Sequence, residues 1–146
     1  LAGAMEGCMI GLRSIALSQA YNVLEDGRTG SCETLEAQAP ERRSKLIGAD
    51  LARGTFLNVN FPRCRPDEVE GVSVTDQGKL VYGLWIDERK DGRGFPYYWL
   101  RFGHEPAENR PGSDLAALKD NLISVTPLKL DLTDRDAMAE LERRIA

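Results

Sequence analysis

The side chains that could act as nucleophiles or proton carriers are few and widely spaced in this chain. The three cysteines, Cys8, Cys32 and Cys64, lie far apart, and no two of them form a CxxC pair. His104 is the only histidine, so a Ser-His-Asp or Cys-His catalytic centre would depend wholly on it. We interpret the cysteines as free, buried or half-buried thiols of a reducing cytoplasm. We interpret His104 as a loop residue without a catalytic task.

One acidic segment has the end spacing of a calcium-binding loop. Asp131 and Glu142 stand where such a loop has its first and last ligands. Inside the segment, however, Thr133 and Arg135 replace oxygen-rich ligands, and Asp136 replaces the glycine that the sharp turn requires. We therefore expect no calcium site there.

A second acidic group lies near an expected turn. Asp87, Glu88 and Asp91 could together hold a hard cation, which prefers oxygen ligands. Arg89 and Lys90 stand between them, and the alternation of charges is typical of a solvated turn. We interpret the group as solvated.

Two amides and one carboxylate offer weaker candidates for a binding site. Asn58 and Asn60 alternate with Val59 on an expected strand, where one of them could bind a phosphate or a metal at the strand end. The preferred interpretation is that both are buried amides that fix neighbouring loops by hydrogen bonds. Glu6 could be a general acid, but we expect it to be a surface residue or a charge partner of Arg13.

Motifs that cradle phosphate are absent from the sequence, which contains neither GxxxxGK[ST] nor GxGxxG. The glycine-bracketed segment 27–31 lacks the lysine of a P-loop. With a net charge of −4, the chain is a poor partner for duplex nucleic acid, which binds cationic surfaces. No apolar run approaches the roughly 18 residues that a transmembrane helix needs. We expect a cytoplasmic protein with no membrane contact.

The hydrophobic patterns predict both helices and strands, with Ser14 to Ser18 as a short buried strand of a parallel sheet. The expected boundaries are a helix stop at Gly11, a turn at residues 91–94, a helix cap at Ser113 and a strand end at Pro127.

Pro40 interrupts the second predicted helix, which either kinks there or begins at Glu41. Thr133 is the expected N-cap of the last helix, with Asp136 in the position of a capping box. The predicted helices cover residues 2–10, 33–52, 114–121 and a C-terminal segment after 133, and the predicted strands cover 14–18, 55–60, 72–76, 79–88, 95–102 and 122–126, with loops at 19–32 and 103–113.

Aromatic residues concentrate in the expected hairpin over residues 79–102. The sequence has ten aromatics in all, two Trp, four Tyr and four Phe. Since Tyr97, Tyr98 and Trp99 are consecutive, they must point to both faces of the hairpin, and an isolated hairpin has nothing to bury them against. We predict that the hairpin contacts another subunit; the alternative is that it folds back on its own sheet. Seven aromatics lie in it: Tyr82, Trp85, Phe95, Tyr97, Tyr98, Trp99 and Phe102.

Several phrases of the sequence together resemble the SurE family of metal-dependent 5'/3'-nucleotidases. They occur in the family's order and approximate spacing, and the resemblance covers nearly the whole chain. The phrases are AMEG at 4–7, SIALS at 14–18, LNVNFP at 57–62, TDQGK at 75–79, YYWL at 97–100 and SVTPLKLDLT at 124–133.

This resemblance implies a partial Rossmann-like α/β fold with a protruding β-hairpin and a C-terminal helix. It implies that the chain is the C-terminal portion of such a protein, in which residues 1–70 form the C-terminal part of the core and residues 71–146 form the hairpin and oligomerisation elements. It also implies hydrolysis of nucleoside 5'/3'-monophosphates with Mg²⁺ or Mn²⁺, and subunits that exchange the hairpin and C-terminal elements to form a dimer or tetramer.

The family's metal ligands and its Ser-Gly-Thr loop are expected on segments ahead of the AMEG phrase. No catalytic or metal ligand is therefore assigned to any position of this chain, and its substrate-binding residues stay open. The 146 residues alone are expected to be inactive. Two alternatives remain: a non-catalytic oligomerisation or scaffold fragment of such an enzyme, and an unrelated α/β ligand-binding domain.

Overall fold

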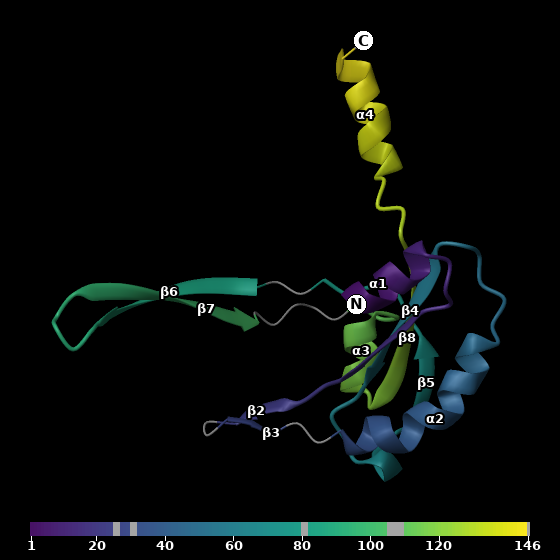
Figure 1. The fold of residues 1–146 in the computed structure, drawn as a ribbon, viewed down its shortest axis with the longest axis horizontal. Helices are drawn as coiled ribbons and strands as arrows, with labels where there is room; N and C mark the ends of the chain where they lie inside the picture. The colour runs from purple at the N-terminus through teal and green to yellow at the C-terminus, as the bar shows by residue number, and fades with distance from the viewer. Residues whose placement is uncertain (25–26, 30–31, 80–81, 105–109, 146) are drawn as a thin grey trace.

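A four-stranded mixed sheet forms the centre of the molecule (Figure 1). The computed structural model describes residues 1–24, 27–29, 32–79, 82–104 and 110–145. The sheet has the order β1-β4-β8-β5, with β1 parallel to β4, β4 antiparallel to β8 and β8 parallel to β5. It takes strands from both sides of residue 70, and it confirms the α/β class. Its strands are β1 (Ile15–Gln19), β4 (Thr55–Phe61), β5 (Gly71–Val74) and β8 (Leu122–Lys129).

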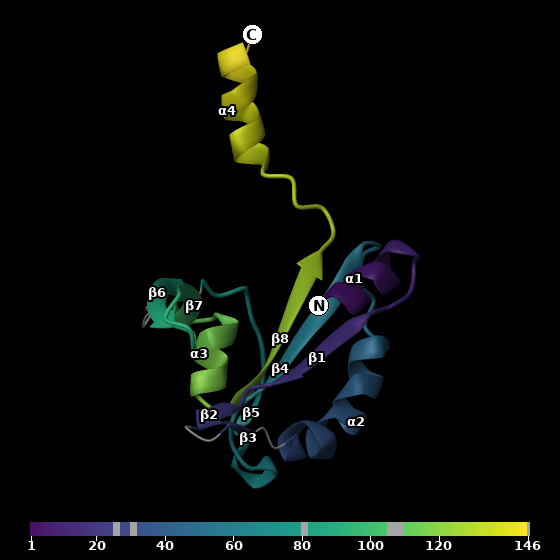
Figure 2. The same ribbon diagram turned by 60° about the vertical axis from the view of Figure 1, so that its left-hand side comes forward.

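The hydrophobic core lies on one face of this sheet. Leu57, Val59 and Phe61 of β4 point to the same side, because side chains alternate along a strand. They form a buried cluster with Ile123, Val125 and Ala39. Ala39 belongs to α2 (Glu33–Ile47), which covers this face. In both views α2 lies on the opposite side of the sheet from α3 (Asp114–Lys119) (Figures 1 and 2).

The second helix differs from its expected form in two ways. It begins at Glu33 and runs through Pro40, so a start at Glu41 is wrong. It also ends at Ile47 rather than at Ala52. The Arg13 guanidinium donates to the carbonyl oxygens of Ile47 (2.6 Å) and Ala49 (3.2 Å), which satisfies carbonyls that a helix end leaves without partners.

The strand predicted at 14–18 is present as β1 and is parallel to β4, but the prediction that it is buried is wrong. Leu17 is 42% exposed. β1 pairs only with β4 among the strands of the described residues, and an edge strand lacks cover on its outer side.

Two further strand predictions need correction. Residues 19–32 were expected to be loop, yet β2 (Asn22–Leu24) pairs antiparallel with β3 (Gly27–Thr29). Residues 25–26 and 30–31 lie outside the described residues. β8 continues to Lys129, past Pro127, which was expected to end it. Pro127 has no N–H to donate to a neighbouring strand. No hydrogen bond to β5 is lost, because β5 pairs only with residues 122–125 of β8.

The second face of the sheet lies on the side of α3, and it carries a cluster of buried hydroxyl groups beside the buried Phe56. The hydroxyl of Thr75 is 2.9 Å from the hydroxyl of Ser124 and 2.8 Å from that of Thr126. All three side chains are buried. Because each hydroxyl has a partner, burial leaves none of them unsatisfied. Ser113 caps α3 as expected, since its hydroxyl accepts from the Ala116 N–H (3.2 Å).

The expected hairpin is confirmed, and it projects from the sheet as a long two-stranded arm (Figure 1). It consists of β6 (Tyr82–Lys90) and β7 (Pro96–His104). Asp91 closes the turn, because its carboxylate accepts from the N–H groups of Arg93 and Phe95 (both 2.9 Å). Leu80 and Val81, which belong to the predicted strand 79–88, and residues 105–109 of the expected loop lie outside the described residues.

The helices at the two ends of the chain are α1 (Ala2–Met9) and α4 (Arg135–Ile145). Gly11 follows α1 with a φ of +87°, a conformation that glycine adopts without strain, and this confirms the expected stop. The expected cap of α4 is wrong. Asp134, one residue after Thr133, caps the helix by accepting from the Ala137 N–H (2.9 Å). Among the described residues, no helix is long and apolar enough to cross a bilayer.

Candidate functional site

Side-chain hydrogen bonds join several elements at the carboxyl ends of the parallel strands β1 and β4. Ligands of α/β sheets commonly bind outside such ends. Gln19, the last residue of β1, donates from Nε2 to the carbonyl oxygen of Pro62 (2.6 Å) and accepts at Oε1 from the Leu35 N–H (3.0 Å). One amide thus ties together the end of β1, the segment after β4 and the first turn of α2.

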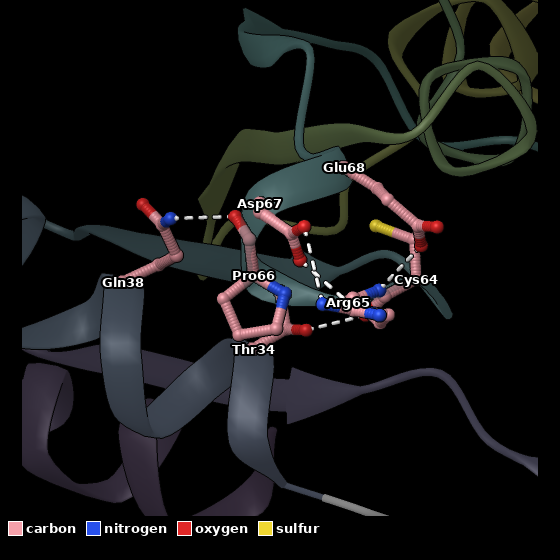
Figure 3. Close-up of polar contacts among 7 residues, drawn as sticks. All are labelled: Thr34, Gln38, Cys64, Arg65, Pro66, Asp67 and Glu68. Atoms are coloured by element: carbon pink, nitrogen blue, oxygen red, sulfur yellow. Dashed lines mark hydrogen bonds and ion pairs between the residues drawn. The ribbon is translucent and has the colours of Figure 1, made fainter.

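A second group of contacts holds the segment after β4 against α2 (Figure 3). Thr34 is 2% exposed, and its hydroxyl donates to the Cys64 carbonyl oxygen (2.5 Å). One helical turn later, Gln38 donates to the Pro66 carbonyl oxygen (3.1 Å). Pro66 begins η1, a short 3-10 helix (Pro66–Glu68). These side chains position loops, and none of them adds a reactive group.

Asn60 forms a hydrogen bond inside the sheet rather than to a loop. Its Oδ1 accepts from the hydroxyl of Ser18 on β1, directly opposite in the parallel register. Asn58 is half-buried on the same face, opposite Ala16 and Thr126. Asn60 is thus a hydrogen-bonded amide as expected, but its partner is the adjacent strand, so the expectation that it fixes a loop is wrong.

The surroundings of Cys64 disfavour its thiolate form. Burial raises the pKa of the Cys64 thiol, and the nearby carboxylates of Glu68, Asp67 and Glu70 raise it further, because a thiolate is disfavoured by desolvation and by like charge. Cys8 is buried and Cys32 is exposed, and all three cysteines are free thiols. The thiolate is the nucleophile, so the raised pKa of Cys64 fits the interpretation of a non-catalytic cysteine.

Alkylation with iodoacetamide tests this description of Cys64. At pH 7.5 we expect Cys32 to react first, and Cys64 to react more slowly because its thiolate fraction is depressed. Removing a nearby negative charge lowers a raised thiol pKa, so Glu68→Gln should speed the reaction of Cys64 at this pH and leave that of Cys32 unchanged. Peptide mass spectrometry over a pH series gives both rates. Faster labelling of Cys64 than of Cys32 at neutral pH would contradict the assignment.

Two of the acidic residues considered as cation ligands, Asp87 and Asp131, are engaged in other contacts. Asp87 pairs with Arg101 across the hairpin (3.2 Å). Asp131 accepts from the Thr133 N–H (3.0 Å) and pairs with Arg135 (2.7 Å). Hydrogen bonds from Thr133, and then from Arg135, lower the pKa of the Asp131 carboxyl. Across residues 1–24, 27–29, 32–79, 82–104 and 110–145, no group of three or more His, Cys, Asp or Glu side chains could hold a metal ion.

The remaining candidates are placed as follows. His104 is the last residue of β7, opposite Tyr82, so its expected position in a loop is wrong. Its side chain lies outside the described residues. Glu6 is an exposed residue of α1, which confirms the expectation of a surface residue. The ion pair with Arg13 that was its alternative is wrong, because the Arg13 guanidinium contacts the end of α2 instead.

Sequence reasoning missed the contacts of the TDQGK phrase with α3. Asp76 forms a bridge with Ser113 and an ion pair with Arg110. The Gly78 N–H donates to the Asp114 carboxylate (2.8 Å). A Cβ at Gly78 would lie 2.7 Å from Asp114 Oδ1 and 2.8 Å from a methyl carbon of Leu115. The phrase therefore fixes the start of α3 to the edge of the sheet, and Gly78 allows the close approach.

The substitution Gly78→Ala should therefore be destabilising. Overpacking of this kind costs about 1–3 kcal/mol in the free energy of unfolding, and we expect a loss in that range on urea denaturation followed by circular dichroism. Gly92→Ala is the matched control, because a Cβ there meets no atom within 4 Å. Equal stability of the Gly78→Ala variant and the parent chain would rule out the tight packing described here.

Comparison with known proteins connects this geometry to a family. Residues 1–83, more than half of the chain, match the family model described as Survival protein SurE. The 5'-nucleotidase SurE of Mesorhizobium japonicum is 56% identical over 146 residues, which are 100% of this chain and 58% of that protein. The 5'-nucleotidase SurE of Brucella canis is 53% identical over 141 residues, 97% of this chain and 55% of that protein.

A solved structure shows the same fold. The crystal structure of the SurE protein from Aquifex aeolicus has a TM-score of 0.75 and 31% sequence identity, and the match covers 99% of this chain and 56% of that one. The chain thus spans a little more than half the length of these relatives. The sequence resemblance and the expected fold are confirmed, and this chain belongs to the SurE family.

Proposed function

We propose that this chain is part of the subunit of an enzyme that removes phosphate from nucleoside monophosphates. The observation that carries the proposal is identity of 53–59% with proteins named 5'-nucleotidase SurE, over 92–100% of this chain. The agreement of the fold with a SurE crystal structure supports it. The proposed substrates are nucleoside 5'- and 3'-monophosphates.

A divalent metal, Mg²⁺ or Mn²⁺, is the proposed cofactor of the whole subunit. When bound, such an ion polarises a phosphoryl group and activates a water molecule. The described residues do not fit the ion, because they provide no cluster of suitable ligands, so we assign none to them. The match covers 58% of the Mesorhizobium relative. We propose that the metal ligands lie in the part of the subunit that corresponds to the rest of that relative.

Within that subunit, the described residues provide framework and contacts between subunits. The hydrogen bonds of Gln19 and Thr34 fix the ends of β1 and β4, and the hairpin projects from the sheet (Figure 1). Figure 2 views this hairpin nearly along its length, with β6 and β7 beside α3. We propose a homodimer or homotetramer held through residues 79–102. The proposed location is the cytoplasm, in keeping with the free thiols.

A phosphatase assay on the intact protein tests the proposed reaction. Phosphate release from 5'-AMP, 3'-AMP and p-nitrophenyl phosphate should require Mn²⁺ or Mg²⁺ and should stop with excess EDTA, because the metal supplies the activated water. Residues 1–146 alone should release none. Failure of the intact protein to hydrolyse 5'-AMP with either metal would overturn the proposal. Metal-dependent turnover by residues 1–146 alone would overturn the placement of the ligands.

A further inference from the structure

Tyr21 places an exposed aromatic side chain at the candidate site. It follows β1 directly after Gln19 and Ala20, and it is 47% exposed. The other exposed aromatic side chains of the described residues all lie in the hairpin of β6 and β7, namely Trp85, Phe95, Tyr97, Tyr98 and Trp99. Tyr21 is therefore the accessible ring at the carboxyl ends of β1 and β4, where ligands of α/β sheets commonly bind.

The backbone on both sides of Tyr21 is held by hydrogen bonds. The Ala20 N–H donates to the Phe61 carbonyl oxygen (2.9 Å), and the Ala20 carbonyl oxygen accepts from the side chain of Gln19 (3.3 Å). On the other side, β2 begins at Asn22 and pairs with β3, and this strand pair extends beyond the end of β1 (Figure 1). A binding residue on such supports loses little conformational freedom when its ligand arrives.

Two polar side chains at this end of the sheet are engaged with the protein itself. Gln19 uses both ends of its amide, on the Pro62 carbonyl oxygen and the Leu35 N–H, and the Thr34 hydroxyl donates to the Cys64 carbonyl oxygen. Neither can read the donors and acceptors of a nucleobase without breaking these bonds. An aromatic ring needs no such pattern, because every base has a π-face on which it can stack.

The charge at this end of the sheet decides which part of a nucleotide can lie there. Glu33 and Glu36 are exposed residues in the first turn of α2, and Leu35 of the same turn bonds to Gln19 at the end of β1. Carboxylates repel a phosphate dianion. The base and the ribose carry no charge at neutral pH, so they fit this end, and the phosphate fits the metal ligands proposed for the rest of the subunit.

We infer that the ring of Tyr21 stacks on the nucleobase of the bound nucleoside monophosphate. This inference rests on the proposed function, and it adds the residue that binds the base. Stacking tolerates any base, so the contact favours nucleotides over phosphate esters that lack a base. Because the base is remote from the reacting phosphoryl group, the contact is the same in the bound substrate and in the transition state. Its loss therefore raises KM and leaves kcat unchanged.

Steady-state kinetics of the intact protein with two matched substrates test this contact. With Mn²⁺ or Mg²⁺ present, Tyr21→Ala should raise the KM for 5'-AMP about tenfold, in line with the loss of one stacked base. Ribose 5-phosphate keeps the sugar and the phosphate but lacks the base. Its KM, or its inhibition constant against 5'-AMP if it is not hydrolysed, should not change. Tyr21→Phe keeps the ring and should keep the KM of the parent for 5'-AMP.

The two substrates separate the possible outcomes. An unchanged KM for 5'-AMP in the Tyr21→Ala variant overturns the stacking. Equal losses on 5'-AMP and ribose 5-phosphate also overturn it, because damage to the fold would weaken both. A loss in Tyr21→Phe as large as in Tyr21→Ala assigns the effect to the hydroxyl and overturns the stacking as well. These three results leave the proposed function standing. A parent protein that does not hydrolyse 5'-AMP overturns the proposed function, and the inference with it.

Discussion

Replacing Phe61 with alanine should lower the free energy of unfolding by about 3–5 kcal/mol, the cost of truncating a phenylalanine in a packed core. Phe61 is 0% exposed and lies in the cluster formed by β4, β8 and α2. The loss would be a large part of a domain's usual stability of about 5–15 kcal/mol. Urea denaturation followed by far-UV circular dichroism measures it, with the midpoint expected to fall at unchanged slope.

Phe95→Ala removes the same number of atoms from an exposed position and serves as the matched control. Phe95 is 67% exposed at the hairpin turn, and surface substitutions usually change stability by no more than about 0.5 kcal/mol. We therefore expect the Phe95→Ala variant to unfold close to the parent chain. Similar losses for the two variants would contradict the assignment of the core to this face of the sheet.

The elements that the sequence predicts well are those whose signals are local. In β4, Leu57, Val59 and Phe61 alternate with polar residues, and the register confirms a strand there. Ser113 stands directly before α3 and caps it. The turn chemistry of Asp91 to Gly94 also closes the hairpin where it was expected. Each of these features depends on residues a few positions apart.

The features that the sequence could not predict depend on residues far apart in the chain. The exposure of Leu17 follows from the position of β1 at an edge of the sheet, which no local pattern encodes. Gln19 bonds to Pro62, 43 positions away, and Gly78 packs against α3 through Asp114 and Leu115. The contacts of the candidate site were also missed by the sequence analysis, because its residues come together only when β1, β4 and α2 assemble.

Converting Trp85 and Trp99 to serine should dissociate the proposed oligomer. Both side chains are about half exposed, at 50% and 56%. They lie on one face of the hairpin, since Trp85 is opposite Arg101 and Asp87 is opposite Trp99. Tryptophans at the centre of an interface often contribute about 2 kcal/mol or more each, so the double substitution should raise the dissociation constant about a thousandfold. Light scattering after gel filtration over a concentration series measures the shift.

Glu88→Ser tests whether any change in the hairpin has this effect. Glu88 lies on the opposite face from Trp85 and is exposed, and an exposed charge mainly affects the association rate and adds little to the binding energy.

The face of the hairpin opposite Trp85 also carries Leu84, Ile86 and Leu100, which are 57%, 64% and 56% exposed. A lone hairpin has no third layer to cover either face, which is why exposed apolar side chains on both faces favour a partner. If the parent protein stays monomeric at high micromolar concentration, the hairpin is not an interface between subunits.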